Sequence, residues 1–140
     1  GSLAGHAATV FTLNVDEAAA SIVSTDRNGV VNVWAMDGRL VDRQQLERHY
    51  ACSTDLNASG NTLVLSSVAR DIPGQPQQTD PSIFVYRRAG PAARWQVSGV
   101  TACPNSKIVA SVKCISAEAN RFVTAEQLIE PAHHTRRRDC

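Results

Sequence analysis

The sequence predicts an all-β protein built from repeated four-stranded antiparallel sheets. Residues 10–35 form three short apolar segments separated by polar turns, and apolar side chains alternate along them as half-buried strands require. The stretch 10–26 has a counterpart of equal length at 51–67 with no gap, at an offset of 41 (51 − 10 = 41). Recurrence at this offset is typical of a supersecondary unit that stacks against its own copies.

The first unit contains four expected strands, at 9–15, 20–25, 30–35 and 40–46. Asn28-Gly29 lies between the second and third strands, and this dipeptide favours a tight hairpin because the turn needs positive φ angles. Val, Ile and Trp alternate along the second and third strands as half-buried strands require.

The second unit begins at 51, with further strands expected at 62–68, 82–87 and near 95–100. A third copy of the opening segment is placed at 112–125, at an offset of 61 (112 − 51 = 61), and supplies only two strands. Two loop-like segments absorb the longer offset: 71–79, which is rich in Pro, Gly and Gln, and 103–107 with its flanks.

Composition indicates a globular protein without a membrane span. The 140 residues carry a net charge of +1, with 43% hydrophobic and 19% charged residues. No apolar run approaches the length of roughly 18 residues that a membrane-spanning helix needs, so no membrane span is expected. The N-terminus lacks the basic-then-apolar pattern of a secretory leader.

The cysteines show neither a redox motif nor zinc-ligand spacing. We expect a reduced intracellular protein, cytoplasmic or nuclear, with buried thiols and with no metal or cofactor. A disulfide between Cys103 and Cys114 across a hairpin stays open as an alternative. The adjacent His133 and His134 do not predict a metal site, because neighbouring side chains point in different directions.

The opening unit carries four residues at characteristic positions. His6 follows Gly5 before the first strand, Ser24 lies in the second, and Trp34 lies in the third, with Asn28 six residues before it. With the repeat of the opening stretch, this pattern resembles the WD-repeat family. That resemblance implies a hydrogen-bonded structural tetrad of His6, Ser24, Asn28 and Trp34.

The pattern departs from the family in several places. The family prefers Asp where Asn28 stands, and Asp26 is a nearby substitute. Ala35 replaces the Asp that usually follows the Trp. In the second unit Asp80 lies six residues before Tyr86, which takes the Trp position, and His49 is a shifted counterpart of His6.

The resemblance implies a partial β-propeller of four-stranded antiparallel blades. Residues 3–47 form the first blade, 48–100 the second with a loop insertion at 71–79, and 101–127 part of a third, with strands a and b only. The basic tail 128–140 is expected to be flexible or docked on a partner. Propellers close with four to eight blades. The chain is therefore expected to be a fragment of a longer protein; a ring completed by copies of the chain or by a partner, and a small independent β-domain, are the alternatives.

The function expected from this fold is that of a non-enzymatic scaffold for protein–protein interaction within a multi-subunit complex. Arg27 and Tyr50 are the candidate partner-binding residues, because Tyr and Arg dominate interface energetics. A hydrolase triad of His6, Ser24 and Asp26 is disfavoured, since the chain has no nucleophile elbow.

The alternative function is an RNA- or ribonucleoprotein-associated component that uses the Arg-rich tail. Arg136, Arg137 and Arg138 are the candidate contacts to phosphate or to an acidic partner. Nucleic acid is not the favoured partner, because the rest of the chain carries no basic stripe.

Overall fold

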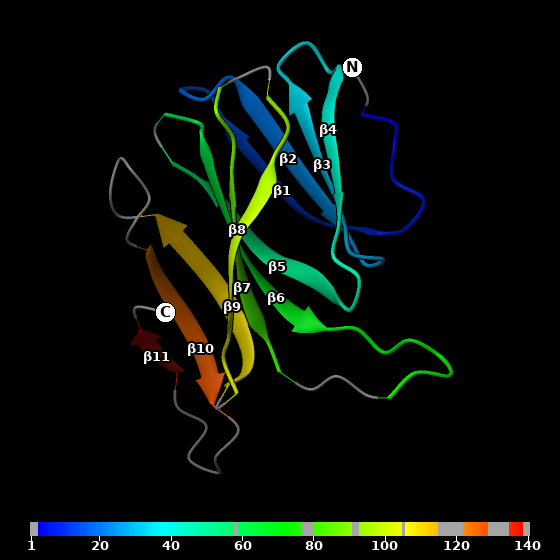
Figure 1. Cartoon of the computed structure of the whole chain (residues 1–140), viewed down its shortest axis with the longest axis vertical. Helices are drawn as coiled ribbons and strands as arrows, with labels where there is room; N and C mark the ends of the chain where they lie inside the picture. Colours follow the sequence, from blue (N-terminus) through cyan, green and yellow to red (C-terminus); the bar gives the residue numbers. More distant parts are fainter. Residues whose placement is uncertain are drawn as a thin grey trace.

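The computed structural model describes residues 3–57, 59–76, 80–90, 93–104, 106–114, 122–128 and 135–138. These residues form three antiparallel sheets and no helix, in agreement with the all-β prediction (Figure 1). The first sheet has the order β1-β2-β3-β4 and consists of β1 (Val10–Asp16), β2 (Ser21–Asp26), β3 (Val30–Ala35) and β4 (Leu40–Gln45).

The second sheet repeats this order along the chain. It consists of β5 (His49–Leu56), β6 (Thr62–Ala69), β7 (Ser82–Arg87) and β8 (Gln96–Ala102). The third sheet has the order β11-β10-β9 and consists of β9 (Ser106–Cys114), β10 (Phe122–Leu128) and β11 (Thr135–Arg138). The strands of the first two sheets begin and end within about two residues of the ranges expected from the sequence.

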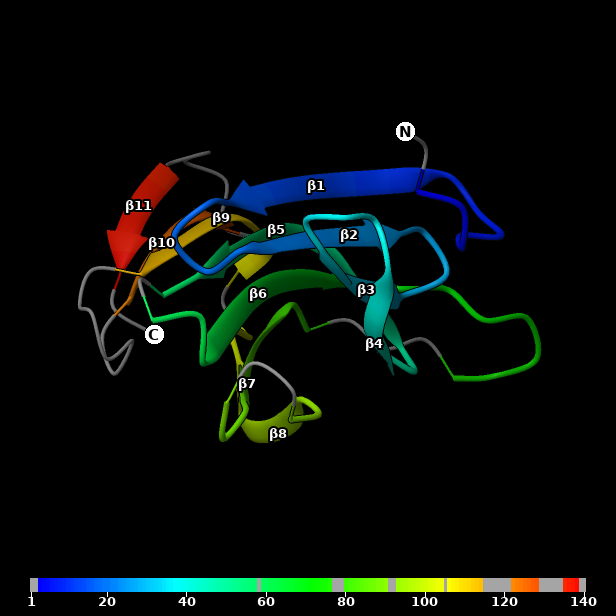
Figure 2. The ribbon, with the colours of Figure 1, turned by 90° about the horizontal axis from the view of Figure 1, so that it is seen from above.

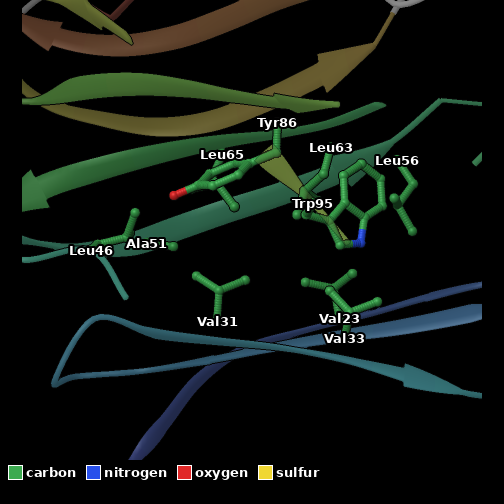
Figure 3. Close-up of a cluster of buried hydrophobic side chains, with 10 residues drawn as sticks. All are labelled: Val23, Val31, Val33, Leu46, Ala51, Leu56, Leu63, Leu65, Tyr86 and Trp95. Atoms are coloured by element: carbon green, nitrogen blue, oxygen red, sulfur yellow. The ribbon is translucent and has the colours of Figure 1, made fainter. Parts of the chain in front are cut away.

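The sheets stack face to face, so each contributes one layer. β1 packs beside β5 and β5 beside β9, which places the first strands of the three sheets next to one another (Figures 1 and 2). Between the first two sheets lies a core of ten buried side chains (Figure 3): Val23, Val31, Val33, Leu46, Ala51, Leu56, Leu63, Leu65, Tyr86 and Trp95.

β6 is buried on both faces. Leu63 and Leu65 belong to the core shared with the first sheet, while Val64 belongs to a second core shared with the third sheet. Successive side chains on a strand point to opposite faces, so a strand between two packed layers needs apolar residues without alternation. This accounts for the continuous run Leu63-Val-Leu65 where the first unit alternates more clearly.

A β-bulge recurs in the first strand of each sheet and fixes how the repeats align. The extra residue is Phe11 in β1 and Cys52 in β5, which reproduces the sequence offset of 41 (52 − 11 = 41). In β9 two residues are extra, Lys107 and Ala110. Ala110 lies four residues before the end of its strand, as Cys52 does in β5, and its offset from Cys52 is only 58 (110 − 52 = 58). The structural counterpart of Val10 is therefore Val109, three residues before the Val112 expected from the sequence.

The tail differs from the sequence expectation. The sequence predicts that 128–140 is flexible or docked on a partner, whereas β11 pairs antiparallel with β10. This gives the third sheet a third strand, one more than expected. Arg136, Arg137 and Arg138 lie opposite Glu126, Ala125 and Thr124 in the strand register. The sequence carries no tight-turn signal for this strand, because residues 129–134 separate it from β10.

Candidate functional site

A buried hydrogen-bond chain joins the N-terminal segment to β2 and β3. His6 Nδ1 lies 2.8 Å from Asp26 Oδ2, and His6 Nε2 lies 2.7 Å from Ser24 Oγ. Trp34 Nε1 donates to the same Ser24 Oγ at 2.8 Å. A carboxylate only accepts, so Nδ1 carries the proton, and Nε2 then accepts from the Ser24 hydroxyl. Every member of the chain is satisfied with a neutral imidazole.

Asp26, not Asn28, completes this chain, which corrects the tetrad expected from the sequence. Besides His6, Asp26 accepts the backbone N–H groups of Asn28 at 2.9 Å and Val30 at 3.1 Å through Oδ1. Asn28 is exposed in the turn, and its backbone carbonyl accepts from Gln45. Ser24 and Asp26 are two residues apart on β2 and therefore share a face, whereas Asn28 lies beyond the end of the strand.

The same geometry makes this site structural. Ser24 is 3% exposed and its oxygen already accepts the Trp34 N–H, so a substrate carbonyl has no route to the hydroxyl. Gly5 lies against the Trp34 ring, where a Cβ atom would come within 2.9 Å of it. The chain of bonds therefore secures residues 5–6 over the outer face of the first sheet.

The second unit does not repeat this network. His49 lies 3.1 Å from the backbone carbonyl of Asp80, not from its carboxylate, and stacks edge-on against Phe84. Tyr86 is buried in the core between the first two sheets, and that burial raises its pKa to about 12. Leu65 occupies the position of Ser24 in the repeat, so no hydroxyl is available there.

A polar cluster at the boundary between the first and second sheets has no counterpart among the residues expected from the sequence. Asp42 of β4 is 5% exposed and accepts the backbone N–H of Trp95 at 2.8 Å and Gln44 Nε2 at 3.0 Å. The guanidinium of Arg88 lies 4.5 Å from the centre of the Trp95 ring. Asp42 and Trp95 are 53 residues apart in the sequence, so no local pattern predicts their contact. It could be predicted only by knowing how the last strands of the two sheets pack.

Side chains of the first strands also bond to the neighbouring sheet. Asn14 Nδ2 donates to the carbonyl of Thr54 at 2.8 Å, and Asp55 accepts the backbone N–H of Cys114 at 2.7 Å and Lys113 Nζ at 3.2 Å. Asn14 and Asp55 are equivalent positions of the repeat (14 + 41 = 55). The same kind of contact thus holds the second sheet to the first and the third sheet to the second.

The candidate partner-binding residues lie at one end of the first strands. Tyr50 is half-buried, and its ring packs edge-on against Phe11 with ring centres 5.3 Å apart. Arg27 is exposed in the turn between β2 and β3, and its backbone N–H donates to the carbonyl of Thr9. The structure therefore brings Arg27 and Tyr50 to the same end of the first sheet. It adds Phe11, which is 48% exposed and which the sequence pattern does not single out.

No disulfide joins Cys103 and Cys114, so that open alternative does not describe this structure. Burial raises the pKa of Cys52 to about 11. Burial, with the charge and hydrogen bond of Asp55, raises the pKa of Cys114 to about 12. Within the described ranges no three His, Cys, Asp or Glu side chains gather as metal ligands, and His133 and His134 fall outside those ranges.

No family model matches the chain, and no curated protein matches it. Solved structures do. The chain is similar to the C-terminal WD40 domain of Sif2, at 12% identity and a TM-score of 0.63, covering 89% of this chain and 33% of that one. The chain has the WD40 β-propeller fold. The fold expected from the sequence resemblance is thus confirmed.

Two further propeller structures are also similar. The WD40 repeats of RRP9 show 13% identity and a TM-score of 0.45, covering 96% of this chain and 52% of that one. The β-propeller domain of Cps50 from Myceliophteria thermophila shows 7% identity and a TM-score of 0.43, covering 87% and 50%. The chain spans a third of the Sif2 structure and about half of the other two. No helix in the part of the chain that the structure describes is long and apolar enough to cross a membrane.

Proposed function

We propose that the chain is a non-enzymatic scaffold that contributes three sheets to a propeller and binds a protein partner within an intracellular complex. The observation that carries the proposal is the aromatic pair of Phe11 and Tyr50, which lies at the same end of the first strands as the exposed Arg27. Aromatic residues and arginine are the residue types that dominate binding energy at protein interfaces. The rigid sheets beneath hold the pair in place.

The outer face of β1 supports the second part of the proposal, that further sheets cover it. Leu13 is 62% exposed and Val15 is 52% exposed, and they share one face of the strand. Asn14, on the opposite face, bonds to Thr54 of the next sheet. An apolar strand face of this kind is covered by a neighbouring sheet in a closed propeller. The rest of a longer propeller or a second copy of the chain supplies that sheet.

Light scattering after size exclusion tests the covering sheet. A defined dimer or trimer of the 15.1 kDa chain supports a ring built from copies, and Leu13→Asp is expected to dissociate it. Aggregation that Leu13→Asp relieves supports a face normally covered by the rest of a longer propeller. The proposal would be contradicted if the chain is a monomer that unfolds cooperatively and if Leu13→Asp has the same stability as the unsubstituted chain.

The partner face is tested by quantitative co-purification from cells that express tagged variants. Phe11→Ser and Tyr50→Ala are expected to lose the same set of proteins, while Met36→Ser, an exposed apolar residue at the opposite end of the first sheet, retains them. If the bound molecules are RNA and are lost only when Arg136, Arg137 and Arg138 are replaced by alanine, the ribonucleoprotein alternative holds instead. Binding that none of these variants changes would also contradict the proposal.

A further inference from the structure

The opposite end of the sheets, away from Phe11 and Tyr50, contains a cleft of about 610 Å³ between the first and second sheets. Turns and strand ends from both sheets line it: Ala18, Ala19, Ala20, Ser21, Ala35, Arg39, Val41, Ser59 and Arg88. Seven of the nine come from the turns and strands of the first sheet, while Ser59 lies between β5 and β6 and Arg88 directly follows β7. Both sheets are therefore needed to form the cleft.

The lining is small and positively charged. Six of its nine residues are alanine or serine, two are arginine, and none is acidic. Where the two sheets meet, Gly60 lies so close to Ala19 that a Cβ atom on Gly60 would come within 2.8 Å of the Ala19 Cβ. Ala20 has a left-handed φ of 49°, which favours glycine, so the turn holds this wall of the cleft in a strained backbone conformation.

The two arginines differ in how firmly they are held. Arg88 is 9% exposed, its Nε donates to the carbonyl of Gly60 at 2.9 Å, and its guanidinium stacks on Trp95. Burial lowers its pKa, an effect that nearby Asp42 opposes. Arg39 is exposed, and the structure records no hydrogen bond or ion pair of its guanidinium with any described residue. One anchored and one exposed arginine therefore line the same cleft.

Three of the nearby carboxylates are already engaged. Asp42 accepts from Trp95, Gln44 and Arg43, and it lies 3.6 Å from Arg94 Nε. Asp37 accepts the backbone N–H of Arg39. Asp16 accepts the backbone N–H of Ala19 in the turn before the cleft. Neither these three nor the exposed Glu17 of the turn after β1 is among the lining residues, so the lining itself offers Arg39 no carboxylate partner.

We propose that this cleft binds an acidic side chain, carboxylate or phosphoryl, carried by an extended segment of a partner protein. Guanidinium groups bind both anions through paired N–H donors, and clusters of arginines are a recurrent way to recognise acidic motifs. The small side chains leave room for a peptide backbone between the sheets. This site is separate from the Phe11–Tyr50 face and goes beyond the proposed function.

Fluorescence anisotropy with labelled peptides tests the proposal on the intact chain. The probes are a peptide rich in Asp and Glu, a phosphoserine peptide, a neutral Gln/Ser peptide and a single-stranded RNA of matching length. At least one acidic peptide is expected to bind, with affinity that falls as salt rises, and the neutral peptide is not. The stronger of the two acidic peptides identifies the source of the anion.

Three variants locate the binding. Arg39→Gln is expected to weaken the acidic peptide about tenfold, because it removes a charge-assisted contact at an exposed position that folding does not need. Ser59→Trp keeps the charge, fills the cleft and should also abolish binding. Arg43→Gln makes the same change of charge at an exposed residue of β4 that does not line the cleft, and it should alter affinity less than about twofold.

Several results would overturn the proposal. These are absent binding of both acidic peptides, an equal loss in Arg43→Gln and Arg39→Gln, or RNA binding that is tighter and shows the same dependence on Arg39. Circular dichroism of each variant establishes that the sheets are intact. Because none of the three substitutions touches Phe11 or Tyr50, failure here leaves the partner-face proposal to its own test.

Discussion

Asp42 accepts the backbone N–H of Trp95 at 2.8 Å across the boundary between the first two sheets. The bond joins the last strand of one sheet to the segment that leads into the last strand of the next. It lies at the outer side of the stack, while the bond between Asn14 and Thr54 lies at the inner side. Together the two bonds fix the second sheet against the first at both ends of the shared apolar core.

Replacing Asp42 with alanine is expected to destabilise the chain by about 2–3 kcal/mol, since it leaves the buried N–H of Trp95 without an acceptor. The measurement is the free energy of unfolding in urea. Asp37→Ala is the matched control: Asp37 also accepts a backbone N–H, but in an exposed turn, and the change should stay within about 1 kcal/mol. Equal losses in the two variants would show that the bond to Trp95 is not important.

The corrected tetrad gives a second prediction. Asp26→Ala removes an acceptor from His6 and from two backbone N–H groups and should cost about 3 kcal/mol, whereas Asn28→Ala should cost less than about 0.5 kcal/mol. Thermal unfolding followed by circular dichroism ranks the two variants. A larger effect at Asn28 than at Asp26 would restore the assignment made from the sequence.

Gly60 provides a third prediction at the inner wall of the cleft. Gly60→Ala should destabilise the chain by about 2–4 kcal/mol, because φ is 68° and the new Cβ meets the Cβ of Ala19. Gly90→Ala, where nothing lies within 4 Å, should be neutral. In the double variant Ala19→Gly, Gly60→Ala the clash between the two Cβ atoms is removed, but the unfavourable φ at residue 60 stays. Urea unfolding of the double variant should therefore recover only part of the lost stability. Failure of that partial rescue would rule out the close approach as the cause.

The half-buried thiols of Cys52 and Cys114 predict a loss of stability in alkali. The pKa values of Cys52 and Cys114 are raised in the folded chain to about 11 and about 12, from 9.0. Between pH 9 and these folded-state pKa values, the unfolded chain has lost the thiol protons whereas the folded chain keeps them. The free energy of unfolding therefore falls as pH rises above 9, and below pH 9 the chain keeps its full stability.

Urea unfolding between pH 8 and 11 measures this dependence, and Cys52→Ala should flatten its onset. The same burial should make both thiols slow to react with a maleimide at pH 7, because the thiolate is the reactive form. Rapid modification of the native chain at Cys52 would contradict the burial seen here.

Much of the fold could be predicted because the repeated sequence aligns the strands of the first two sheets residue by residue. The gapless match at an offset of 41 aligns the two bulges at Phe11 and Cys52. The third repeat lies three residues from its expected place, because no aromatic or Gly-His signal marks its start. Apolar residues alone match at several registers, and only the backbone pairing around Ala110 selects one.

The site was harder to predict than the fold. Counting back from Trp34 across the hairpin leads to Asn28, because the sequence does not say how many residues the turn between β2 and β3 contains. Counting forward from Ser24 along β2 stays within one strand, where residues two apart always share a face, and it identifies Asp26. The contact between Asp42 and Trp95 has no local signal at all, since it depends on how two sheets pack.

The paired contacts of Asn14 and Asp55 have a consequence for how such a chain can vary. Each fixes the rotation from one sheet to the next through the innermost strands, far from the outer connections. The connection between β6 and β7 is long, whereas that between β2 and β3 is a tight turn, yet the same inner contact follows both. Outer loops can therefore lengthen or shorten without altering the curvature of the stack. The angle between neighbouring sheets is set by a few polar atoms of the innermost strands, whatever the length of these loops.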